Sequence, residues 1–229
     1  MRKKRMAKVT AVIPVRGGSR RLPNKNILPF GDSNLLVHKI RQLKLVAEID
    51  DIVVSSDSDI MLDMARREGV IVQKRPDEYC DEKTKTFNEV VEYVASHTSG
   101  DHMIWAPCVC PLVTPAMYSD AIQKYFTIVV NGGGDSLVSV KLFKEYLWGE
   151  SGPINYTAEK HVPSQQLPDW KVIINGFYMA SREDMVDWKY FFGKNPAMYV
   201  IDKDHAIDID DGVDFAMAEL LYKKMAQQN

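Results

Sequence analysis

Hydrophobic positions in the first half of the chain follow two alternating periods. Short, continuously apolar runs, which are typical of buried strands, are separated by longer segments with the apolar spacing of helices. The expected strands are 9–15, 52–56, 70–73 and 103–108, and the expected helices are 35–46, 59–68, 86–96 and 115–126. Strands that alternate with helices form parallel βαβ units. We therefore expect an α/β fold built on a doubly wound, mostly parallel sheet.

This alternation stops after an apolar run at 136–141. Residues 142–171 are rich in Trp, Tyr, Pro and Gly and have no clean period, which indicates an insertion made of extended pieces. Structureless loops of this length are unusual in compact domains, so we expect this inserted arm to dock on another surface. Three further elements are expected, namely strands at 172–180 and 198–201 and a helix at 212–225. The whole chain, 1–229, is interpreted as a single domain that carries the arm.

Composition and charge restrict the classes of function. The 229 residues are 45% hydrophobic, enough for one domain with a full core. The net charge of -2 provides no overall cationic field, so nucleic acid is not an expected partner. No apolar stretch approaches the roughly 18 residues that a membrane span needs. The odd, sparse set of Cys80, Cys108 and Cys110 argues against a disulfide framework and favours a reducing compartment, so a cytoplasmic location is expected.

The segment after the first expected strand has the residues of a phosphate-binding loop. From 16 to 26 it reads Arg-Gly-Gly-Ser-Arg-Arg-Leu-Pro-Asn-Lys-Asn. Two glycines allow the backbone to approach a ligand, and four cationic side chains suit several phosphate charges. In open parallel sheets, ligands bind beyond the carboxyl ends of the strands, where this loop is expected. The spacing is neither a Walker motif nor a dinucleotide fingerprint, and an exposed basic turn is the less favoured alternative.

An acidic pair lies near the end of the chain. Asp208 and Asp210 flank one isoleucine, and in extended backbone this spacing directs both carboxylates to the same face. Two hard oxygen ligands suit magnesium, which usually takes one or two carboxylates together with phosphate oxygens. Apolar residues precede the pair, which makes a solvated acidic turn the weaker alternative. Asp211 and Asp214 are expected only to cap the following helix.

Taken in order along the chain, these and other strings resemble the CMP-sugar-acid synthetases. That family includes the acylneuraminate cytidylyltransferases and, more distantly, the 3-deoxy-manno-octulosonate cytidylyltransferases. The string IPVRGGSRRLPNKN at 13–26 is the most specific match. The others are Val54-Ser55-Ser56-Asp57, Arg75-Pro76 followed by Thr86, Cys110-Pro111-Leu112, Gln165-Gln166-Leu167-Pro168, Asn175-Gly176 and Ile207-Asp208-Ile209-Asp210. The resemblance implies a Rossmann-like nucleotidyltransferase that transfers CMP from CTP to an acidic, nonulosonic-acid-like sugar and releases pyrophosphate.

The resemblance also implies roles for individual residues. The nucleotide would contact Arg16, Gly17, Gly18, Ser19, Arg20, Lys25, Asn26, Arg75 and Thr86. Gln165, Gln166 and Asn175 would contact the sugar acid, and Lys171 could supply a positive charge for its carboxylate, as could Lys141 or Lys160, without bidentate geometry. Asp208 and Asp210 would bind magnesium, and Arg16, Lys25 and Asp210 would carry catalysis by stabilising charge on the phosphates. The arm at 142–171 would cross to a second subunit and form a homodimer.

Several positions depart from the family pattern. Arg20 and Arg21 replace a Lys-Gly pair, and Pro107 replaces a glutamine on the nucleotide side. Ser164 stands where the sialic-acid branch has an arginine, and no arginine directly precedes Asn175. An arginine fork pairs both oxygens of a carboxylate, so its absence predicts that N-acetylneuraminic acid is a poor substrate and that a different acid is used.

Two alternatives stay open. One is a related nucleotidyltransferase that uses another nucleotide or a non-sugar acid, although the Gly-x-Gly-x-Arg loop of the sugar-phosphate enzymes is absent. The other is a non-catalytic nucleotide-binding protein. Such a protein needs no acidic pair, so the presence of Asp208 and Asp210 beside the cationic loop argues against it.

Overall fold

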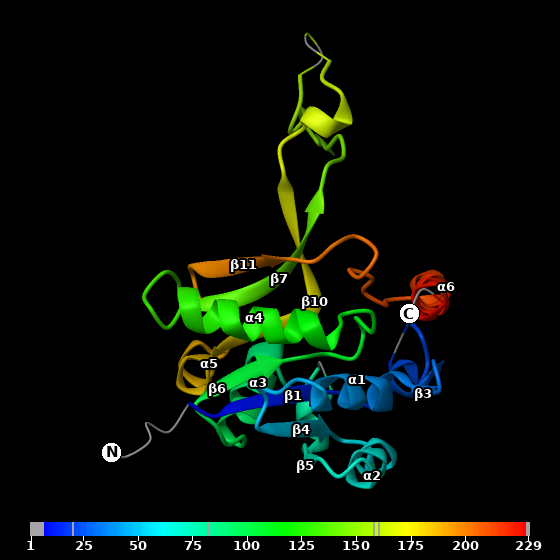
Figure 1. Ribbon diagram of the computed structural model, residues 1–229, viewed down its shortest axis with the longest axis vertical. Helices are drawn as coiled ribbons and strands as arrows, with labels where there is room; N and C mark the ends of the chain where they lie inside the picture. The colour runs from blue at the N-terminus through cyan, green and yellow to red at the C-terminus, as the bar shows by residue number, and fades with distance from the viewer. Residues whose placement is uncertain (1–6, 20, 82, 158, 160, 228–229) are drawn as a thin grey trace.

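The computed structural model of the chain describes residues 7–19, 21–81, 83–157, 159 and 161–227. Within them, seven strands form a central sheet in the order β11-β7-β10-β6-β1-β4-β5 (Figure 1). These strands are β1 (Val9–Pro14), β4 (Asp51–Ser56), β5 (Ile71–Lys74), β6 (His102–Trp105), β7 (Ser136–Phe143), β10 (Trp170–Ser181) and β11 (Pro196–Val200). Strand β10 is antiparallel to both its neighbours, and the others run in one direction. The expected mostly parallel, doubly wound sheet is confirmed.

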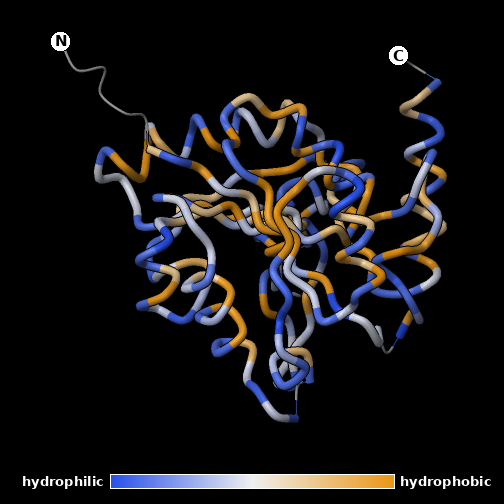
Figure 2. Tube along the Cα trace, turned by 90° about the horizontal axis from the view of Figure 1, so that it is seen from below, coloured by the Kyte–Doolittle hydropathy of each residue, from blue (hydrophilic) through white to orange (hydrophobic). Residues whose placement is uncertain are grey.

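Helices cover both faces of this sheet. They are α1 (Leu35–Lys44), α2 (Asp59–Arg67), α3 (Phe87–Ser96), α4 (Pro115–Ile128), α5 (Arg182–Trp188) and α6 (Gly212–Ala226). Apolar residues of α1, α2, α4 and α6 share one buried cluster with the sheet, and those of α3 and α5 share a second. Figure 2 shows the hydrophobic segments gathered in the middle of the molecule. In the described part of the chain, no helix is both long and apolar enough to cross a membrane.

Most helices begin where the sequence supplies a capping side chain. Asn34, Ser58 and Thr114 each accept a hydrogen bond from the amide three residues further on. Asp211 and Asp214 form a reciprocal capping box at the start of α6, which confirms the capping expected of them. This box also orients the segment just before it, because Asp214 Oδ2 accepts from the Asp210 amide at 2.9 Å.

Strand β6 and helix α5 differ from the sequence expectation. Strand β6 ends at Trp105 rather than at 108, because Pro107 has no amide to continue the ladder. Cys108 and Cys110 therefore lie beyond the strand, where both are buried. Helix α5, which Ser181 caps, was not expected, since its seven residues are too few for a period to be recognised.

The inserted arm projects away from the sheet (Figure 1). Its base continues two sheet strands, since β7 reaches Phe143 and β10 begins at Trp170, so both ends of the segment expected at 142–171 lie inside strands. Between them lie a small hairpin, β8 (Trp148–Gly149) with β9 (Gly152–Pro153), and a 3-10 turn at Ser164–Gln166. A second small hairpin, β2 (Pro29–Phe30) with β3 (Ser33–Asn34), precedes α1. Trp148 at the hairpin of the arm is 71% exposed in the single chain.

Candidate active site

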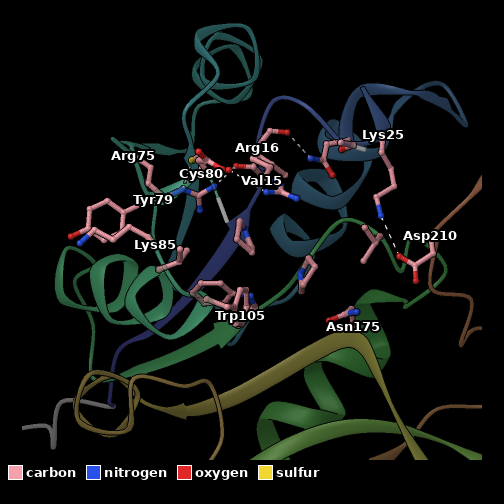
Figure 3. A pocket seen from close by; sticks show the side chains of 18 of the residues that line it. Val15, Arg16, Lys25, Arg75, Tyr79, Cys80, Lys85, Trp105, Asn175 and Asp210 are labelled. Carbon is pink, nitrogen blue, oxygen red and sulfur yellow. Dashed lines mark hydrogen bonds and ion pairs between the residues drawn. The ribbon is translucent and has the colours of Figure 1, made fainter. Parts of the chain in front are cut away.

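A cavity of about 590 Å³ opens at the carboxyl ends of β1, β5 and β6. Ligands of parallel sheets bind at this edge. The cavity is lined by these residues singled out from the sequence: Arg16, Ser19, Lys25, Asn26, Arg75, Thr86, Asn175, Asp208 and Asp210. Figure 3 shows Lys25 and Asp210 at one end of the cavity and Arg75, Tyr79 and Lys85 at the other. The fold thus joins the loop after β1 to an acidic pair that lies almost two hundred residues later in the chain.

The loop after β1 is held by hydrogen bonds from neighbouring segments. The Gly17 amide donates to Asp57 Oδ1 at 2.9 Å, just beyond the end of β4. Gly18 has a φ of 70°, which a residue without a Cβ adopts at little cost. Arg16 Nη1 donates to the carbonyl of Cys80 at 3.1 Å, which holds the guanidinium at the cavity wall. Arg20 lies outside the described residues.

Asn26 is buried at the end of this loop. Its Nδ2 donates to the carbonyl of Arg16 at 3.1 Å, and its Oδ1 accepts from the Cys108 thiol at 3.2 Å. The side chain therefore ties the two ends of the loop together and joins them to the segment after β6. In this arrangement Asn26 shapes the cavity, whatever contact it makes with a ligand.

Arg75 directly follows β5 and is almost fully buried. Its Nη2 donates to the carbonyl of Val15 at 2.8 Å, and its Nε donates to Cys80 Sγ at 2.9 Å. Burial raises the pKa of the Cys80 thiol, while the hydrogen bond from Arg75 acts against that rise. A buried cation fixed beside the end of β1 provides a directed positive charge for an anionic or carbonyl oxygen.

Thr86 stands at the start of α3, where it is part of a capping box. Its Oγ1 accepts from the Glu89 amide at 3.3 Å, and its own amide donates to Glu89 Oε2 at 2.9 Å. That backbone hydrogen bond, with help from Lys85, lowers the pKa of Glu89 to about 2. Lys85 Nζ also lies 5.3 Å from the centre of the Tyr79 ring, so a cation–π contact fixes it at the cavity rim.

An aromatic wall that was not expected from the sequence closes this end of the cavity. It consists of Tyr79, Phe87, Trp105 and Phe191. The Phe191 ring lies 5.5 Å from that of Phe87 and 6.0 Å from that of Trp105, which joins the loop after α5 to α3 and β6. The three consecutive aromatic residues at 190–192 were the available signal. The rings are inclined to one another, at 75° for Phe87 and Phe191, so they form an apolar aromatic lining beside a buried arginine, which suits a heterocycle.

The other end of the cavity contains Asp208. Its Oδ2 accepts hydrogen bonds from the backbone amide and from Nδ2 of Asn175, at 3.2 and 2.8 Å. Its Oδ1 is buried and has no hydrogen-bond partner among the residues that the structure describes. Burial raises the pKa of Asp208, and the two hydrogen bonds from Asn175 oppose that rise. An oriented carboxylate with one unpaired buried oxygen is a candidate ligand for a cation.

Asp210 and Lys25 lie close to each other at the same end of the cavity as Asp208. Arg21 Nη2 lies 2.7 Å from Asp210 Oδ1, and Lys25 Nζ lies 3.7 Å from the same oxygen. Lys25 Nζ also donates to the carbonyl of Ile209 at 2.6 Å, so this lysine contacts the segment between the two acids. Two carboxylates and two cations therefore share one end of the cavity, where an anion and a cation can be bound side by side.

The acidic pair would give a metal ion two protein ligands. Across the described ranges, no group of three or more His, Cys, Asp or Glu side chains is arranged to hold a metal ion. A hard cation at Asp208 and Asp210 would therefore complete its coordination with ligand oxygens or water, which is the usual arrangement for Mg²⁺ bound with a phosphate.

Three of the expected substrate residues do not line this cavity. Gln165 and Gln166 belong to the 3-10 turn of the arm, where Lys144 Nζ donates to the Gln165 carbonyl at 3.1 Å. Lys171 lies in the outer part of β10 and is exposed. Asn175 is the one member of the expected set that reaches the cavity, because a register shift in β10 between Ile173 and Tyr178 places it there.

Comparison with known proteins identifies relatives of this sequence. The sequence model of the family described as cytidylyltransferase matches residues 10–128. The N-acylneuraminate cytidylyltransferase of Escherichia coli O18:K1:H7 is 24% identical over 96% of this chain, which spans 54% of that relative. The pseudaminic acid cytidylyltransferase of Campylobacter jejuni is 23% identical over 93% of this chain and 95% of the relative. This chain therefore spans about half the length of the first relative and nearly all of the second.

Solved structures support the fold. The structure of CMP:2-keto-3-deoxy-manno-octonic acid synthetase complexed with CTP has a TM-score of 0.72 at 14% identity, covering 97% of this chain and 100% of that one. A 4-diphosphocytidyl-2C-methyl-D-erythritol synthase from Anaerococcus prevotii has a TM-score of 0.64 at 12% identity, covering 95% and 96%. At these identities the likeness concerns the fold alone.

Proposed function

Because the chain belongs to the cytidylyltransferase family, we propose that it transfers CMP from CTP to a hydroxyl of an acidic sugar and releases pyrophosphate. The observation that carries the proposal is the meeting of a cationic loop, a buried arginine and an acidic pair in one cavity at the strand ends. In the reaction, the hydroxyl oxygen bonds to the α-phosphorus, the bond to the β-phosphate oxygen breaks, and the hydroxyl proton passes to solvent. Such a transfer needs little covalent chemistry from the protein, so positioning and electrostatics carry it.

We assign the two ends of the cavity to the two parts of CTP. The aromatic wall and Arg75 suit the cytosine ring, with Thr86 at its edge. Arg16, Ser19 and Lys25, with the amide of Gly18, suit the triphosphate, while the Gly17 amide, which donates to Asp57 Oδ1, holds the loop in place. Lys25 and Arg16 then offset the charge that builds on the leaving pyrophosphate. No side-chain general base is assigned.

Magnesium is proposed at Asp208 and Asp210. The unpaired buried Oδ1 of Asp208 supports this choice, because a carboxylate oxygen without a donor is costly unless a cation joins it. When bound, magnesium would supply a Lewis acid for the α-phosphate and the attacking hydroxyl. Asn175 orients Asp208 for this task through two hydrogen bonds. Arg21, which pairs with Asp210 in this structure, would have to turn toward the phosphates when the metal binds.

A homodimer is proposed for the arm and for the residues of the sugar site. Gln165, Gln166 and Lys171 are on the projecting arm, so they reach a cavity of this kind only if the arm crosses to a second copy. The exposure of Trp148 and Trp170, at 71% and 44%, supports a partner for the arm. The two-fold arrangement would be symmetric, each arm serving the other subunit. The free thiols of Cys80, Cys108 and Cys110 support the expected cytoplasmic location.

The acid itself is proposed to be other than N-acetylneuraminic acid. The arginines that would pair with its carboxylate are missing, and the C. jejuni relative named for pseudaminic acid supports a modified nonulosonic acid as the class. A purified preparation should release pyrophosphate from CTP, but not from UTP, GTP or dTTP, when a panel of such acids is supplied with magnesium. Pyrophosphate released equally from all four nucleotides would favour a related nucleotidyltransferase. Nucleotide binding without any pyrophosphate would favour the non-catalytic alternative.

A further inference from the structure

A lysine is completely buried against the turn that follows β6. Lys39, on the inner face of α1, has no exposed surface. Its Nζ donates to the carbonyl of Cys110 at 3.0 Å and to Tyr118 Oη at 2.8 Å, and it lies 4.9 Å from the centre of the Tyr118 ring. Burial lowers the pKa of Lys39 to about 8. An uncharged side chain of similar volume would fill this space without the cost of desolvating an ammonium group, so stability alone does not account for the residue.

The first contact of Lys39 leads to the backbone between the two acids. Cys110 directly follows Val109, whose carbonyl accepts the Ile209 amide at 2.9 Å. Ile209 is fully buried and separates Asp208 from Asp210. By fixing the Cys110 carbonyl, the ammonium fixes the loop on which the acidic segment is hydrogen-bonded.

The second contact leads to Asp208 from the other side. An ammonium group only donates hydrogen bonds, so Tyr118 Oη accepts from Lys39 and donates its own hydrogen to another acceptor. That proton goes to the carbonyl of Gly176 at 3.2 Å. Gly176 directly follows Asn175, whose amide and side chain both donate to Asp208 Oδ2.

This part of β10 is irregular and relies on side chains for its hydrogen bonds. The register shifts between Ile173 and Tyr178. Ser139 Oγ donates to the Ile174 carbonyl and accepts from the Phe177 amide, both at 2.9 Å. Tyr118 holds the Gly176 carbonyl that lies between them. The bulge that presents Asn175 to Asp208 is therefore set by neighbouring side chains rather than by a regular ladder.

We propose that Lys39 is a positioning residue for the acidic pair, holding through Cys110 and Tyr118 the two backbone segments that orient Asp208 and Ile209. The inference rests on the proposed metal site at Asp208 and Asp210. It predicts that Lys39 tunes metal affinity without touching metal, nucleotide or acid. Partners that orient metal ligands typically change affinity by about 10- to 100-fold when removed.

The test measures Mn²⁺ binding by electron paramagnetic resonance, with and without CTP and with the acid omitted. Lys39→Met keeps the length of the side chain and removes the charge, and Tyr118→Phe keeps the ring and removes the hydroxyl. Lys44→Met is the matched control, since Lys44 is on the same helix but pairs with Glu68 at the surface. Lys39→Met should bind Mn²⁺ about tenfold more weakly than the native chain, and Lys44→Met should not differ from it. Tyr118→Phe removes the hydrogen bond to Gly176 and leaves the Lys39–Cys110 contact, so it should also weaken binding, and its effect should not simply add to that of Lys39→Met, because the two residues share a hydrogen bond.

Steady-state kinetics supply a second readout. The Mg²⁺ concentration needed for half-maximal rate should rise in Lys39→Met while KM for CTP at saturating Mg²⁺ stays near the native value.

A folded Lys39→Met with native Mn²⁺ affinity would overturn the inference. If Lys39→Met fails to fold, Tyr118→Phe decides, and native affinity in that variant would overturn it as well. A native chain that binds no Mn²⁺, or Asp208→Asn binding it equally well, would refute the metal site and this inference together. Affinity lost in Asp208→Asn but unchanged in Lys39→Met would refute this inference alone.

Discussion

Replacing Lys25 with methionine separates a role in catalysis from a role in folding. Lys25 donates to the carbonyl of Ile209 at 2.6 Å and lies 3.7 Å from Asp210 Oδ1, and only 16% of its side chain is exposed. Both partners belong to the acidic segment, so the lysine has a structural contact in addition to its proposed contact with pyrophosphate. Lys25→Met keeps most of the apolar stem and removes the charge.

The two roles predict effects of different size. A hydrogen bond from a charged group contributes about 1.5–3 kcal/mol, so Lys25→Met should lower the free energy of unfolding by about 2 kcal/mol. From a typical stability of at least about 5 kcal/mol, such a loss leaves roughly 99% of the molecules folded. Removing one preorganised charge from a transition state, in contrast, costs about 100- to 1,000-fold in rate. Unfolding therefore cannot produce the loss of activity that the catalytic role predicts.

The assay couples pyrophosphate release to a continuous readout and is paired with urea denaturation of the same preparation. Lys124→Met is the control, because Lys124 pairs with Asp120 on α4 at 2.9 Å and does not line the cavity. Lys25→Met should lose at least about 100-fold in kcat, and Lys124→Met should lose little. If Lys25→Met keeps its rate per folded molecule within a few-fold of the native value, the lysine is structural and its assignment to the leaving group is wrong.

Three further outcomes are expected. Burial lowers the pKa of His38 from 6.5 to about 4; the unfolded chain therefore binds a proton at pH 5 that the folded chain does not, and stability should fall by about 2 kcal/mol between pH 7 and pH 5. Urea denaturation of His38→Gln should lack that part of the pH dependence, and an unchanged dependence would exclude His38 as its source. Sedimentation at micromolar concentration should find a dimer that Trp148→Glu together with Trp170→Glu dissociates; a native chain that is strictly monomeric would contradict the proposed arm exchange. N-acetylneuraminic acid should have a lower kcat/KM than the best acid of the panel, and equal efficiency would mean that the missing arginines do not matter.

The sequence predicted the sheet well, because its strands and helices carry clear periods and end at clear signals. The expected strands at 9–15 and 52–56 lie within a residue of β1 (Val9–Pro14) and β4 (Asp51–Ser56). Tertiary context explains the errors. Strand β10 extends into the arm because its outer residues pair with β7, and no local period marks that pairing.

The candidate site was predictable where residue types are diagnostic and unpredictable where only packing decides. A loop with two glycines and four cations, and two aspartates spaced so that both carboxylates lie on one face of extended backbone, indicate their chemistry in any fold. Trp105 and Phe191 do not, since aromatic residues are most often core residues and only the fold brings these two to the cavity. Lys39 was missed for the same reason. A lysine within a helix is usually at the surface, and its burial appears only once α1 is packed against the turn at Cys110.

The proposed transfer is tested most directly by ³¹P nuclear magnetic resonance of a mixture of the protein, CTP, magnesium and the panel of acidic sugars. If CMP is transferred to an acid, the CTP resonances should be replaced by pyrophosphate and by one phosphodiester of CMP joined to that acid, in equal amounts. Both products should be absent when the metal is chelated or when Asp208→Asn replaces the native chain. Conversion of CTP to CDP and phosphate, or pyrophosphate formed without a CMP-linked acid, would contradict the transfer of CMP to an acidic sugar.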